Sequence, residues 1–313
     1  MNNRKILVLS KEKDDIFNIP FFYYDKNDID IKNLVEKHLF SFIERDLAEQ
    51  DNTKKQIIPY IVVKDSKGRF FTYKRKGKEK RLHGFFSIGA GGHVDLNDII
   101  ANLNKSLLKF KNIEDSTLEK DKFNLDIDDF FEIIKLTLLR ELYEEVGIKI
   151  DKNDFDKKLK FLGIINEDIS SVGKVHLGFV YLYEILNNEK ITLIDKEIDF
   201  FEFYEPIKIQ NIWDSLEKWS ILALSLLNIN KTLLYISDKN LILEKKANFF
   251  NNHGFTEFIE FIDQYDDIVN FKLFLDFIIS SKNDKKLYFY VDNEEKFSKI
   301  NSILHENGLI KIN

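Results

Sequence analysis

The residues with the clearest chemical potential are three glutamates in one short stretch, Glu141, Glu144 and Glu145. A helix turns by about 100° per residue, so Glu144 and Glu145 lie about −60° and +40° from Glu141, and the three carboxylates share one face. Like charges at these spacings disfavour a helix, and negative charge disfavours its carboxyl end. A hard divalent cation would neutralise them, and oxygen ligands suit Mg²⁺ or Mn²⁺. The alternative is an acidic helix face exposed to solvent, without a metal.

A helix over residues 129–146 is predicted to position these glutamates. Asp129 is the expected N-cap, with Glu132 three residues later as its capping-box partner. Gly147 follows the last periodic residue, as expected of a glycine that ends a helix. The apolar residues of the stretch fall on another side of the helix, which predicts that this side packs on a core.

A glycine-rich segment precedes this helix in the chain. Residues 81–95, RLHGFFSIGAGGHVD, contain four glycines in nine positions, which predicts irregular backbone. Upstream, residues 57–64 and 69–74 are rich in β-branched and aromatic residues and flank a turn, so they predict a hairpin. Gly91 and Gly92 would let backbone approach a diphosphate, or form a tight strand-to-loop turn; both roles are compatible.

Together, the glycine-rich segment and the sequence R-E-L-Y-E-E-V-G-I at 140–148 resemble the Nudix hydrolase motif. That motif is G, five residues, E, seven residues, then R-E-[apolar]-x-E-E-x-G-[apolar], and its second half matches at every defined position. Five ordered blocks also resemble one subgroup of predicted phosphoesterases in this family: QIIPY at 56–60, Tyr73 to Arg75, residues 81–95, VGKVHLG at 172–178 and LEKWS at 216–220. The resemblance covers about residues 50–225. It implies an α+β fold, the Nudix-type α/β/α sandwich with a mixed sheet.

The first half of the motif departs from the family pattern, because a polar stretch at 96–127 splits it. We interpret this stretch as an insertion. Six residues after Gly92 stands Asp98 instead of a glutamate. Counting back from the second half points to Glu132, which would face away from the other glutamates on a continuous helix, and a role as helix cap is favoured. Asp95 and Asp98 are the alternatives for the missing ligand.

The resemblance implies Mg²⁺-dependent hydrolysis of a pyrophosphate bond in a nucleoside diphosphate linked to another moiety, with Mn²⁺ as a second suitable ion. The implied metal ligands are Glu141, Glu144, Glu145 and the backbone carbonyl near Gly91. The implied catalytic residues are Glu144, Glu145 and Arg140, the last orienting a glutamate by a charge-assisted hydrogen bond. One of the glutamates or a carboxylate of another loop would deprotonate water, and Glu167 and Glu217 are candidates.

Substrate contacts are expected from four residues of the matching blocks: Gly92, His93, Arg75 and Arg81. For Arg75 and Arg81 a solvated strand edge is an equal alternative to phosphate binding. For His93, as for His176, packing against neighbours is the more common role of a lone histidine. The alternative function for the chain is a catalytically weak sensor or regulatory protein that keeps the Nudix fold and binds a nucleotide derivative.

A second domain is predicted after residue 230. TLLYIS, TEFIEFI, KLYFYV and LIKI read as short strands, with helical segments at about 239–252, 267–281 and 293–307 between them. Strands alternating with helices predict a small parallel α/β unit of unknown role at 231–313, beside a Nudix-like domain at 1–230. Asp238, Asp263 and Asp292 follow three of these strands; we expect helix N-caps there, with ligand contacts as the alternative.

The composition excludes several classes of protein. None of the 313 residues is a cysteine, so disulfides, thiolate nucleophiles and iron–sulfur clusters are ruled out. The net charge of −6 gives no strong nucleic-acid signal. No apolar run approaches the roughly 18 residues of a membrane span, so a cytoplasmic protein is expected. The expected partner is a small-molecule nucleotide derivative, and a homodimer is compatible with the sequence.

Overall fold

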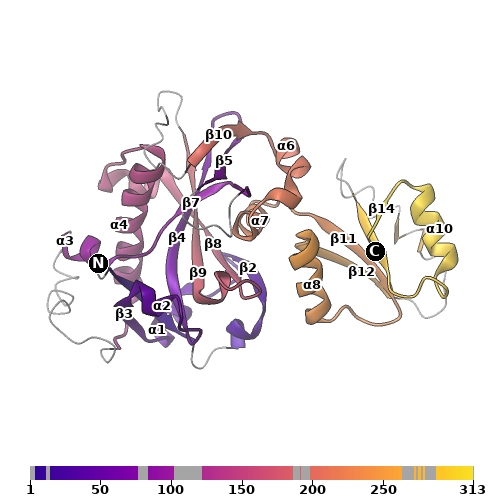
Figure 1. Cartoon of the computed structure of the whole chain (residues 1–313), viewed down its shortest axis with the longest axis horizontal. Helices are drawn as coiled ribbons and strands as arrows, with labels where there is room; N and C mark the ends of the chain where they lie inside the picture. Colours follow the sequence, from indigo (N-terminus) through magenta and orange to yellow (C-terminus); the bar gives the residue numbers. More distant parts are fainter. Residues whose placement is uncertain are drawn as a thin grey trace. The chain divides into compact units, whose positions relative to one another are not determined.

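The structure is a computed structural model of the chain (Figure 1). It describes residues 4–11, 15–76, 84–101, 122–185, 191, 198–262, parts of 271–278, and 287–312. Contacts between Cα atoms divide the chain into two compact units, Met1–Asn228 and Ile229–Asn313, and each is described by itself.

The first unit is built on one large mixed sheet. Its strands are β1 (Lys5–Ser10), β2 (Phe21–Asp25), β3 (Phe40–Glu44), β4 (Lys54–Lys64), β5 (Phe70–Arg75), β6 (Phe86–Ser87), β7 (Gly89–Gly91), β8 (Leu159–Glu167), β9 (His176–Glu184) and β10 (Ile198–Tyr204). The central order is β10-β5-β4-β9-β8-β2, and β1, β3, β6 and β7 pair alongside this path. Strands β4 and β9 are parallel, and the other pairs that the described residues form are antiparallel. The predicted α+β class with a mixed sheet is confirmed.

Seven α-helices are described in this unit. They are α1 (Ile31–Lys37), α2 (Arg45–Ala48), α3 (Leu96–Ala101), α4 (Ile127–Val146), α5 (Phe155–Lys158), α6 (Pro206–Asn211) and α7 (Lys218–Ser225). The helix expected at about 211–228 is shorter than predicted, because a 3₁₀ turn at Trp213–Ser215 separates α6 from α7. Of the expected insertion at 96–127, α3 and the last residues are described, and 102–121 lie outside the described residues.

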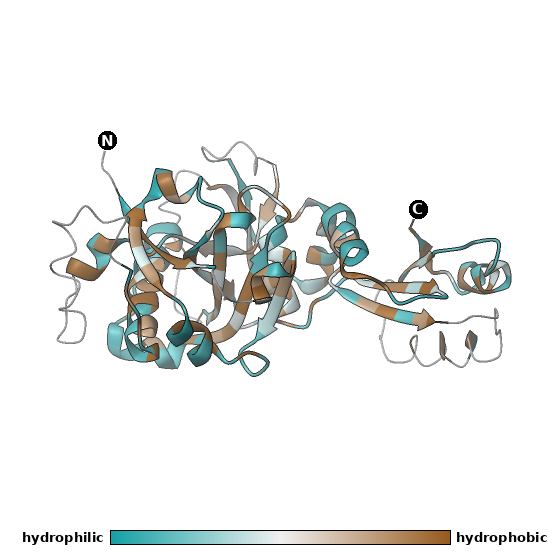
Figure 2. Ribbon diagram, turned by 90° about the horizontal axis from the view of Figure 1, so that it is seen from below, coloured by the Kyte–Doolittle hydropathy of each residue, from teal (hydrophilic) through white to brown (hydrophobic). Residues whose placement is uncertain are grey.

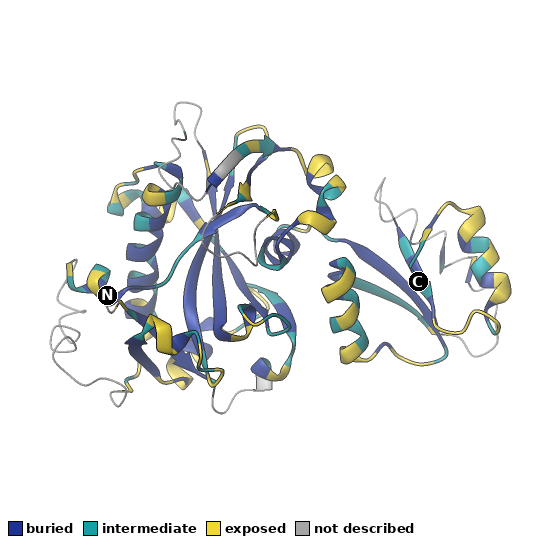
Figure 3. Cartoon of the chain, viewed as in Figure 1, coloured by how far each residue is buried: buried dark blue, intermediate teal, exposed yellow. Residues whose placement is uncertain are grey.

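Strand β4 shows how the two faces of the sheet are used. Side chains alternate along a strand, and Ile57 and Ile61 join the hydrophobic core that includes the inner face of α4. Tyr60 points to the other face, where its ring packs edge-on against Trp219 of α7 with centroids 5.8 Å apart. Helices α4 and α7 therefore cover opposite faces of the sheet, as Figure 1 shows, which is the layering of an α/β/α sandwich. Hydrophobic residues run along the strands (Figure 2), and the central strands are buried (Figure 3).

The start of α4 differs from the prediction. Its N-cap is Asp126, whose carboxylate accepts a hydrogen bond from the backbone N–H of Asp129 at 2.8 Å. The helix therefore begins at Ile127, and Asp129 lies in its first turn. Glu132 pairs with Lys152 and is not part of a capping box, so that interpretation was wrong. The carboxyl end agrees with the prediction, since Gly147 caps the helix with φ of 73°.

The predicted hairpin is confirmed as β4 and β5. Its turn is held by Asp65, whose carboxylate accepts hydrogen bonds from the backbone N–H groups of Lys67 and Arg69 at 3.0 and 2.9 Å. Gly68 has φ of 78°, a conformation that favours glycine. Strand β5 then carries Tyr73 and Arg75 toward the glycine-rich segment, because β6 pairs with the end of β5.

The second unit is a four-stranded parallel sheet in the order β12-β11-β13-β14. The strands are β11 (Thr232–Ser237), β12 (Glu257–Ile262), β13 (Tyr288–Val291) and β14 (Ile310–Lys311), and the helices are α8 (Leu243–His253) and α10 (Ser298–Glu306). The expected parallel α/β character is confirmed. The expected helix at 267–281 lies largely outside the described residues.

Helix N-caps were expected at the aspartates that follow these strands, and this is wrong for the two that the structure describes, Asp238 and Asp292. Asp292 accepts from the Ser237 hydroxyl and from Lys245 at 3.2 and 2.6 Å, and Asp238 pairs with Lys296 at 2.7 Å. Both carboxylates thus join segments of the sheet edge by ion pairs. Asp263 lies outside the described residues.

The described helices of both units include none that is long and apolar enough to cross a membrane.

Candidate active site

The guanidinium of Arg140 is the centre of the acidic cluster on α4. Its Nη1 lies 2.5 Å from Glu141 Oε1 and 2.9 Å from Glu144 Oε2, while its Nε donates to Asp98 Oδ2 at 2.7 Å. Its Nη2 donates to the backbone carbonyl of His93 at 3.0 Å. One cation therefore ties two of the three glutamates to the segment that follows β7 and to α3.

The glutamates differ in exposure, and this sets their electrostatics. The Glu141 side chain is 9% exposed and that of Glu144 is 55% exposed. Burial raises the pKa of Glu141, Arg140 acts in the opposite direction, and the neighbouring Glu144 adds to the rise. Burial alone would lower the pKa of Arg140, but Glu141 and Asp98 raise it above its usual value. Negative charge is thus concentrated at the end of α4, and Arg140 pairs with two of its three glutamates.

Gly92 is required by the close approach of Glu141. A Cβ atom built at Gly92 would overlap the carboxylate of Glu141, which leaves room for hydrogen alone. At Gly91 a Cβ would approach the backbone carbonyl of Pro59 in the neighbouring strand β4. Gly92 thus lets the segment after β7 lie against the acidic end of α4, and Gly91 lets β7 lie close to β4.

We expect Gly92→Ala to disrupt this arrangement. The added methyl group would displace the Glu141 carboxylate from Arg140, so the metal-supported turnover proposed below should fall by about tenfold or more, as losses of ordered ligand positions commonly do. The control is Gly308→Ala in the second unit, where φ of 73° strains an alanine but no neighbouring atom meets the added methyl group, so it tests whether backbone strain alone lowers turnover. Turnover of Gly92→Ala equal to that of wild type would show that Glu141 needs no fixed position.

The third glutamate, Glu145, faces a different group of residues. Its charge acts on Arg75 and Tyr73 of β5, raising the pKa of each. Burial has the largest effect on the pKa of both groups, and it raises the pKa of Tyr73. Burial acts to lower the pKa of Arg75, but the charge of Glu217, followed by other anionic partners that include Glu145, raises it above its usual value. Arg75 therefore lies in the field of two carboxylates, one from α4 and one from the start of α7.

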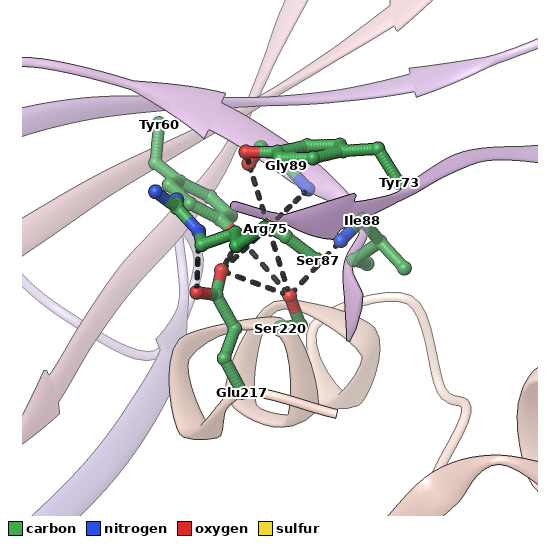
Figure 4. Close-up of polar contacts among 8 residues, drawn as sticks. All are labelled: Tyr60, Tyr73, Arg75, Ser87, Ile88, Gly89, Glu217 and Ser220. Carbon is green, nitrogen blue, oxygen red and sulfur yellow. Dashed lines mark hydrogen bonds and ion pairs between the residues drawn. The ribbon is translucent and has the colours of Figure 1, made fainter. Parts of the chain in front are cut away.

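Figure 4 shows the carboxylate of Glu217, which Arg75 and three hydroxyl groups surround. Arg75 Nε lies 3.0 Å from Glu217 Oε2. The other oxygen, Oε1, accepts from Ser87 at 2.5 Å, from Tyr60 at 3.0 Å and from Ser220 at 3.2 Å. These donors come from β4, β6 and α7, and burial raises the pKa of the Tyr60 hydroxyl, so that it stays a donor.

This network was not predicted as a unit. The sequence predicted roles for Arg75 and Glu217 separately, but none for Tyr60, Ser87 or Ser220. Each of the three lies in a block of sequence that resembles the phosphoesterase subgroup, at 56–60, 81–95 and 216–220. That shared resemblance is the sequence feature that could have drawn attention to them. Their convergence depends on strand pairing, since Tyr60 and Gly91 are direct partners in the sheet.

The three residues considered for the missing ligand are engaged elsewhere. Asp95 pairs with Arg4 at 2.6 Å and is buried. Asp98 is bound by Arg140, and burial raises its pKa against the effect of that arginine. Glu132 lies nine residues before Glu141, about 13 Å along the helix, and pairs with Lys152. Of the three, only Asp98 shares a partner with the α4 glutamates.

The four residues expected to contact substrate have different positions in the structure. Gly92 and Arg75 lie at the site as described, while Arg81 lies outside the described residues. The ring of His93 lies at the start of β4 and β9, where its Nε2 is 2.7 Å from Gln56 Oε1 and 3.4 Å from His176 Nε2. Burial, followed by the charge of Arg45, lowers the pKa of His93 well below its usual value.

Glu167, the other candidate for the base that deprotonates water, accepts hydrogen bonds from Ser170 at the end of β8.

The chain is similar to a bacterial sequence and to several solved structures. No protein-family model matches the chain. The protein YmaB of Bacillus subtilis (strain 168) is 29% identical over 231 residues, which cover 71% of this chain and 97% of YmaB. The crystal structure of Tm1382, provisionally described as a Nudix hydrolase, has 27% identity and a TM-score of 0.46, covering 72% of this chain and 99% of Tm1382.

Two further solved structures are more distant. The MutT protein from Methanosarcina mazei Go1 has 14% identity and a TM-score of 0.33, covering 56% of this chain and 94% of its own. A Nudix hydrolase from Alicyclobacillus acidocaldarius has 15% identity and a TM-score of 0.37, covering 56% and 90%.

Proposed function

We propose that this chain is a Nudix-type hydrolase that cleaves the pyrophosphate bond of a nucleotide derivative with the help of Mg²⁺. The observation that carries the proposal is the close approach of the Glu141 carboxylate to Gly92 at the end of α4, where Arg140 joins Glu141 and Glu144 to Asp98 and to the His93 carbonyl. Three acidic side chains destabilise the carboxyl end of a helix electrostatically, so helix formation alone does not account for them.

The residues present fit a hard divalent ion. Glu141, Glu144 and Glu145 offer carboxylate oxygens, and the backbone carbonyl of Gly91 adds a neutral oxygen, which is the ligand type that Mg²⁺ and Mn²⁺ prefer. When bound, such an ion would neutralise phosphate oxygens and orient the diphosphate. Arg140 pairs with Oε1 of Glu141 and Oε2 of Glu144, so an ion would bind these two glutamates through the other oxygen of each carboxylate.

Arg75 is the candidate phosphate-binding side chain of the site. Glu217 and its hydroxyl donors fix the guanidinium of Arg75, and the charge of Glu145 reaches it from α4. A fixed guanidinium presents several N–H donors in a plane, which suits phosphate oxygens. We assign Glu217 as the residue that positions Arg75.

The same contacts argue against Glu217 as the base that deprotonates water. Oε1 of Glu217 already accepts three hydrogen bonds, and Oε2 is paired with Arg75. Both oxygens of Glu217 are therefore already engaged by donors of the protein. Glu167 is held by two hydrogen bonds from Ser170 at the end of β8. We therefore propose that the base is one of the α4 glutamates.

We expect Glu217→Gln to weaken substrate binding more than the chemical step. The amide would leave Arg75 without its anionic partner, so KM should rise by about tenfold while kcat falls by less than about threefold. The matched control is Glu202→Gln, which removes an exposed carboxylate paired with Lys208 at 2.8 Å. An unchanged KM, or a loss confined to kcat, would contradict the positioning role.

A nucleotide sensor without turnover is the second candidate function. The observation in its favour is that Asp95, Asp98 and Glu132 are each held by a basic residue, so none of them stands ready as a further metal ligand. The two candidates are separated by a screen of nucleoside triphosphates, nucleotide sugars, dinucleoside polyphosphates and nicotinamide or flavin dinucleotides with added Mg²⁺ or Mn²⁺. Metal-dependent phosphate or nucleotide release supports the hydrolase, and saturable binding without release supports the sensor.

A further inference from the structure

Three side chains converge on one point at the start of the parallel strands β4 and β9, away from the α4 glutamates. Glu49 follows α2, His93 follows β7, and His176 is the first residue of β9. Their ligand atoms all lie within 4.8 Å of one another. The separations are 3.4 Å between the two Nε2 atoms, 4.0 Å from His93 Nε2 to Glu49 Oε1, and 3.9 Å from His176 Nε2 to Glu49 Oε1.

These three distances match the size of a small transition-metal ion. In the plane of the three ligand atoms, the point equidistant from all of them lies about 2.2 Å from each atom. Bonds from Zn²⁺ are about 2.0–2.1 Å to histidine nitrogen and about 2.0–2.2 Å to carboxylate oxygen. A shift of a few tenths of an ångström would therefore bring all three atoms to bonding distance.

The hydrogen bond of His176 prepares its ring for this role. His176 Nδ1 lies 2.6 Å from the backbone carbonyl of Val172. A carbonyl oxygen only accepts, so Nδ1 carries the hydrogen, and Nε2 of the neutral ring offers its lone pair to the cluster. Metal-binding histidines typically have their second nitrogen fixed by a backbone carbonyl in this way.

Gln56 supplies a second, independent indication of a ligand. Its side chain is 0% exposed, and its Oε1 lies 2.7 Å from His93 Nε2. An amide oxygen only accepts, so His93 Nε2 donates to it in the metal-free chain, and an ion that binds there would displace this hydrogen as a proton. Its amide Nε2 has no hydrogen-bond partner among the described residues. A buried amide without a partner costs free energy. An ion at the cluster, with a bound water or with Glu49 turned to it, would give this donor an acceptor.

We propose that Glu49, His93 and His176 form a site for a divalent transition-metal ion of the Zn²⁺ type. Two imidazoles and one carboxylate favour such an ion over Mg²⁺, which prefers oxygen ligands throughout. The Glu49 side chain is 34% exposed, so the ion has access from solvent and a fourth position is open to water. Arg45, whose Nε lies 3.7 Å from Glu49 Oε1 and whose side chain is 46% exposed, can turn outward when the ion binds.

This site would stabilise the neighbouring active site without contributing to its chemistry. His93 follows Gly92 directly, and its backbone carbonyl accepts from Arg140. An ion bound by its ring would join the glycine segment to α2 and β9. The site shares no ligand with the α4 cluster, so the inference is independent of the proposed hydrolase function.

The test uses Co²⁺ as a spectroscopic probe for Zn²⁺ in the metal-free full-length chain. We expect one equivalent of Co²⁺ to give visible absorption bands that Zn²⁺ displaces. Glu49→Gln and His176→Gln should weaken Co²⁺ binding by at least about tenfold. Two matched controls should bind as wild type: Glu36→Gln, a helix glutamate with a basic i−4 partner like Glu49, and His305→Ala, an exposed histidine of the second unit.

Three results would overturn the proposal. One is the absence of Co²⁺ bands in wild type. Another is equal Co²⁺ affinity in Glu49→Gln and its control. The third is loss of the bands in Glu145→Gln, which would place the ion at α4. Glu49→Gln is nearly isosteric and partly exposed, so it decides the question even if the buried His176→Gln variant fails to fold.

Discussion

Replacing Glu145 by glutamine is expected to lower turnover at least about 100-fold, equivalent to about 2.7 kcal/mol of activation free energy, while the protein stays folded. The substitution keeps the shape of the side chain and removes one negative charge from the set that would hold Mg²⁺. Glu145 also lies in the field of Arg75, so its loss removes the link between the metal ligands and the candidate phosphate-binding residue. Glu144→Gln should behave in the same way.

The control for this experiment comes from the same helix. Glu132→Gln alters a glutamate that pairs with Lys152, about 13 Å from Glu141 along the axis, and should retain turnover within about twofold. Initial rates should be measured with the substrate that the screen identifies, over a range of Mg²⁺ concentrations. Equal rates in Glu145→Gln and Glu132→Gln would remove the basis for the site assignment.

The second large effect concerns stability. We expect Arg140→Gln to lower the free energy of unfolding of the first unit by about 3 kcal/mol in the absence of metal. The side chains of Arg140 and Glu141 are 19% and 9% exposed, so the substitution leaves a largely buried carboxylate without its cation. The double variant Arg140→Gln, Glu141→Gln should recover part of this loss, since no unpaired charge then remains at Glu141.

Both tryptophans of the chain, Trp213 and Trp219, belong to the first unit, so denaturant unfolding followed by their fluorescence reports on that unit. The control Lys32→Gln breaks an exposed pair with Glu36 on α1 and should change the stability by less than about 0.5 kcal/mol. If Arg140→Gln unfolds like wild type, the contacts of Arg140 do not hold the acidic cluster together.

Local patterns in the sequence were sufficient for much of the fold. Alternation of apolar residues and the Asp65–Gly68 turn predicted the hairpin of β4 and β5, and Gly147 marked the end of α4. The start of α4 was misplaced because several aspartates precede it. Asp126 and Asp129 are equally good cap residues by type, and only the backbone shows that Asp126 accepts the capping hydrogen bond.

The site was predictable where it lies on one helix and unpredictable where it depends on distant strands. Spacing alone places Glu141, Glu144 and Glu145 on one face of α4. Tyr60 and Ser87, two of the partners of Glu217, lie 157 and 130 residues before it in the chain. Their convergence follows from the pairing of β4 with β7 and the packing of α7 on the sheet. The pairing of Asp98 with Arg140 across the insertion likewise had no sequence signal.

The most direct test of the central proposal is an anomalous diffraction measurement on crystals of the full chain soaked with Mn²⁺. We expect a manganese peak at the end of α4, bound by oxygens of Glu141, Glu144 and Glu145 and by the carbonyl of Gly91, at distances of about 2.0–2.3 Å. A map with no manganese at this position, and with the three side chains turned into solvent away from Gly91, would contradict the proposal.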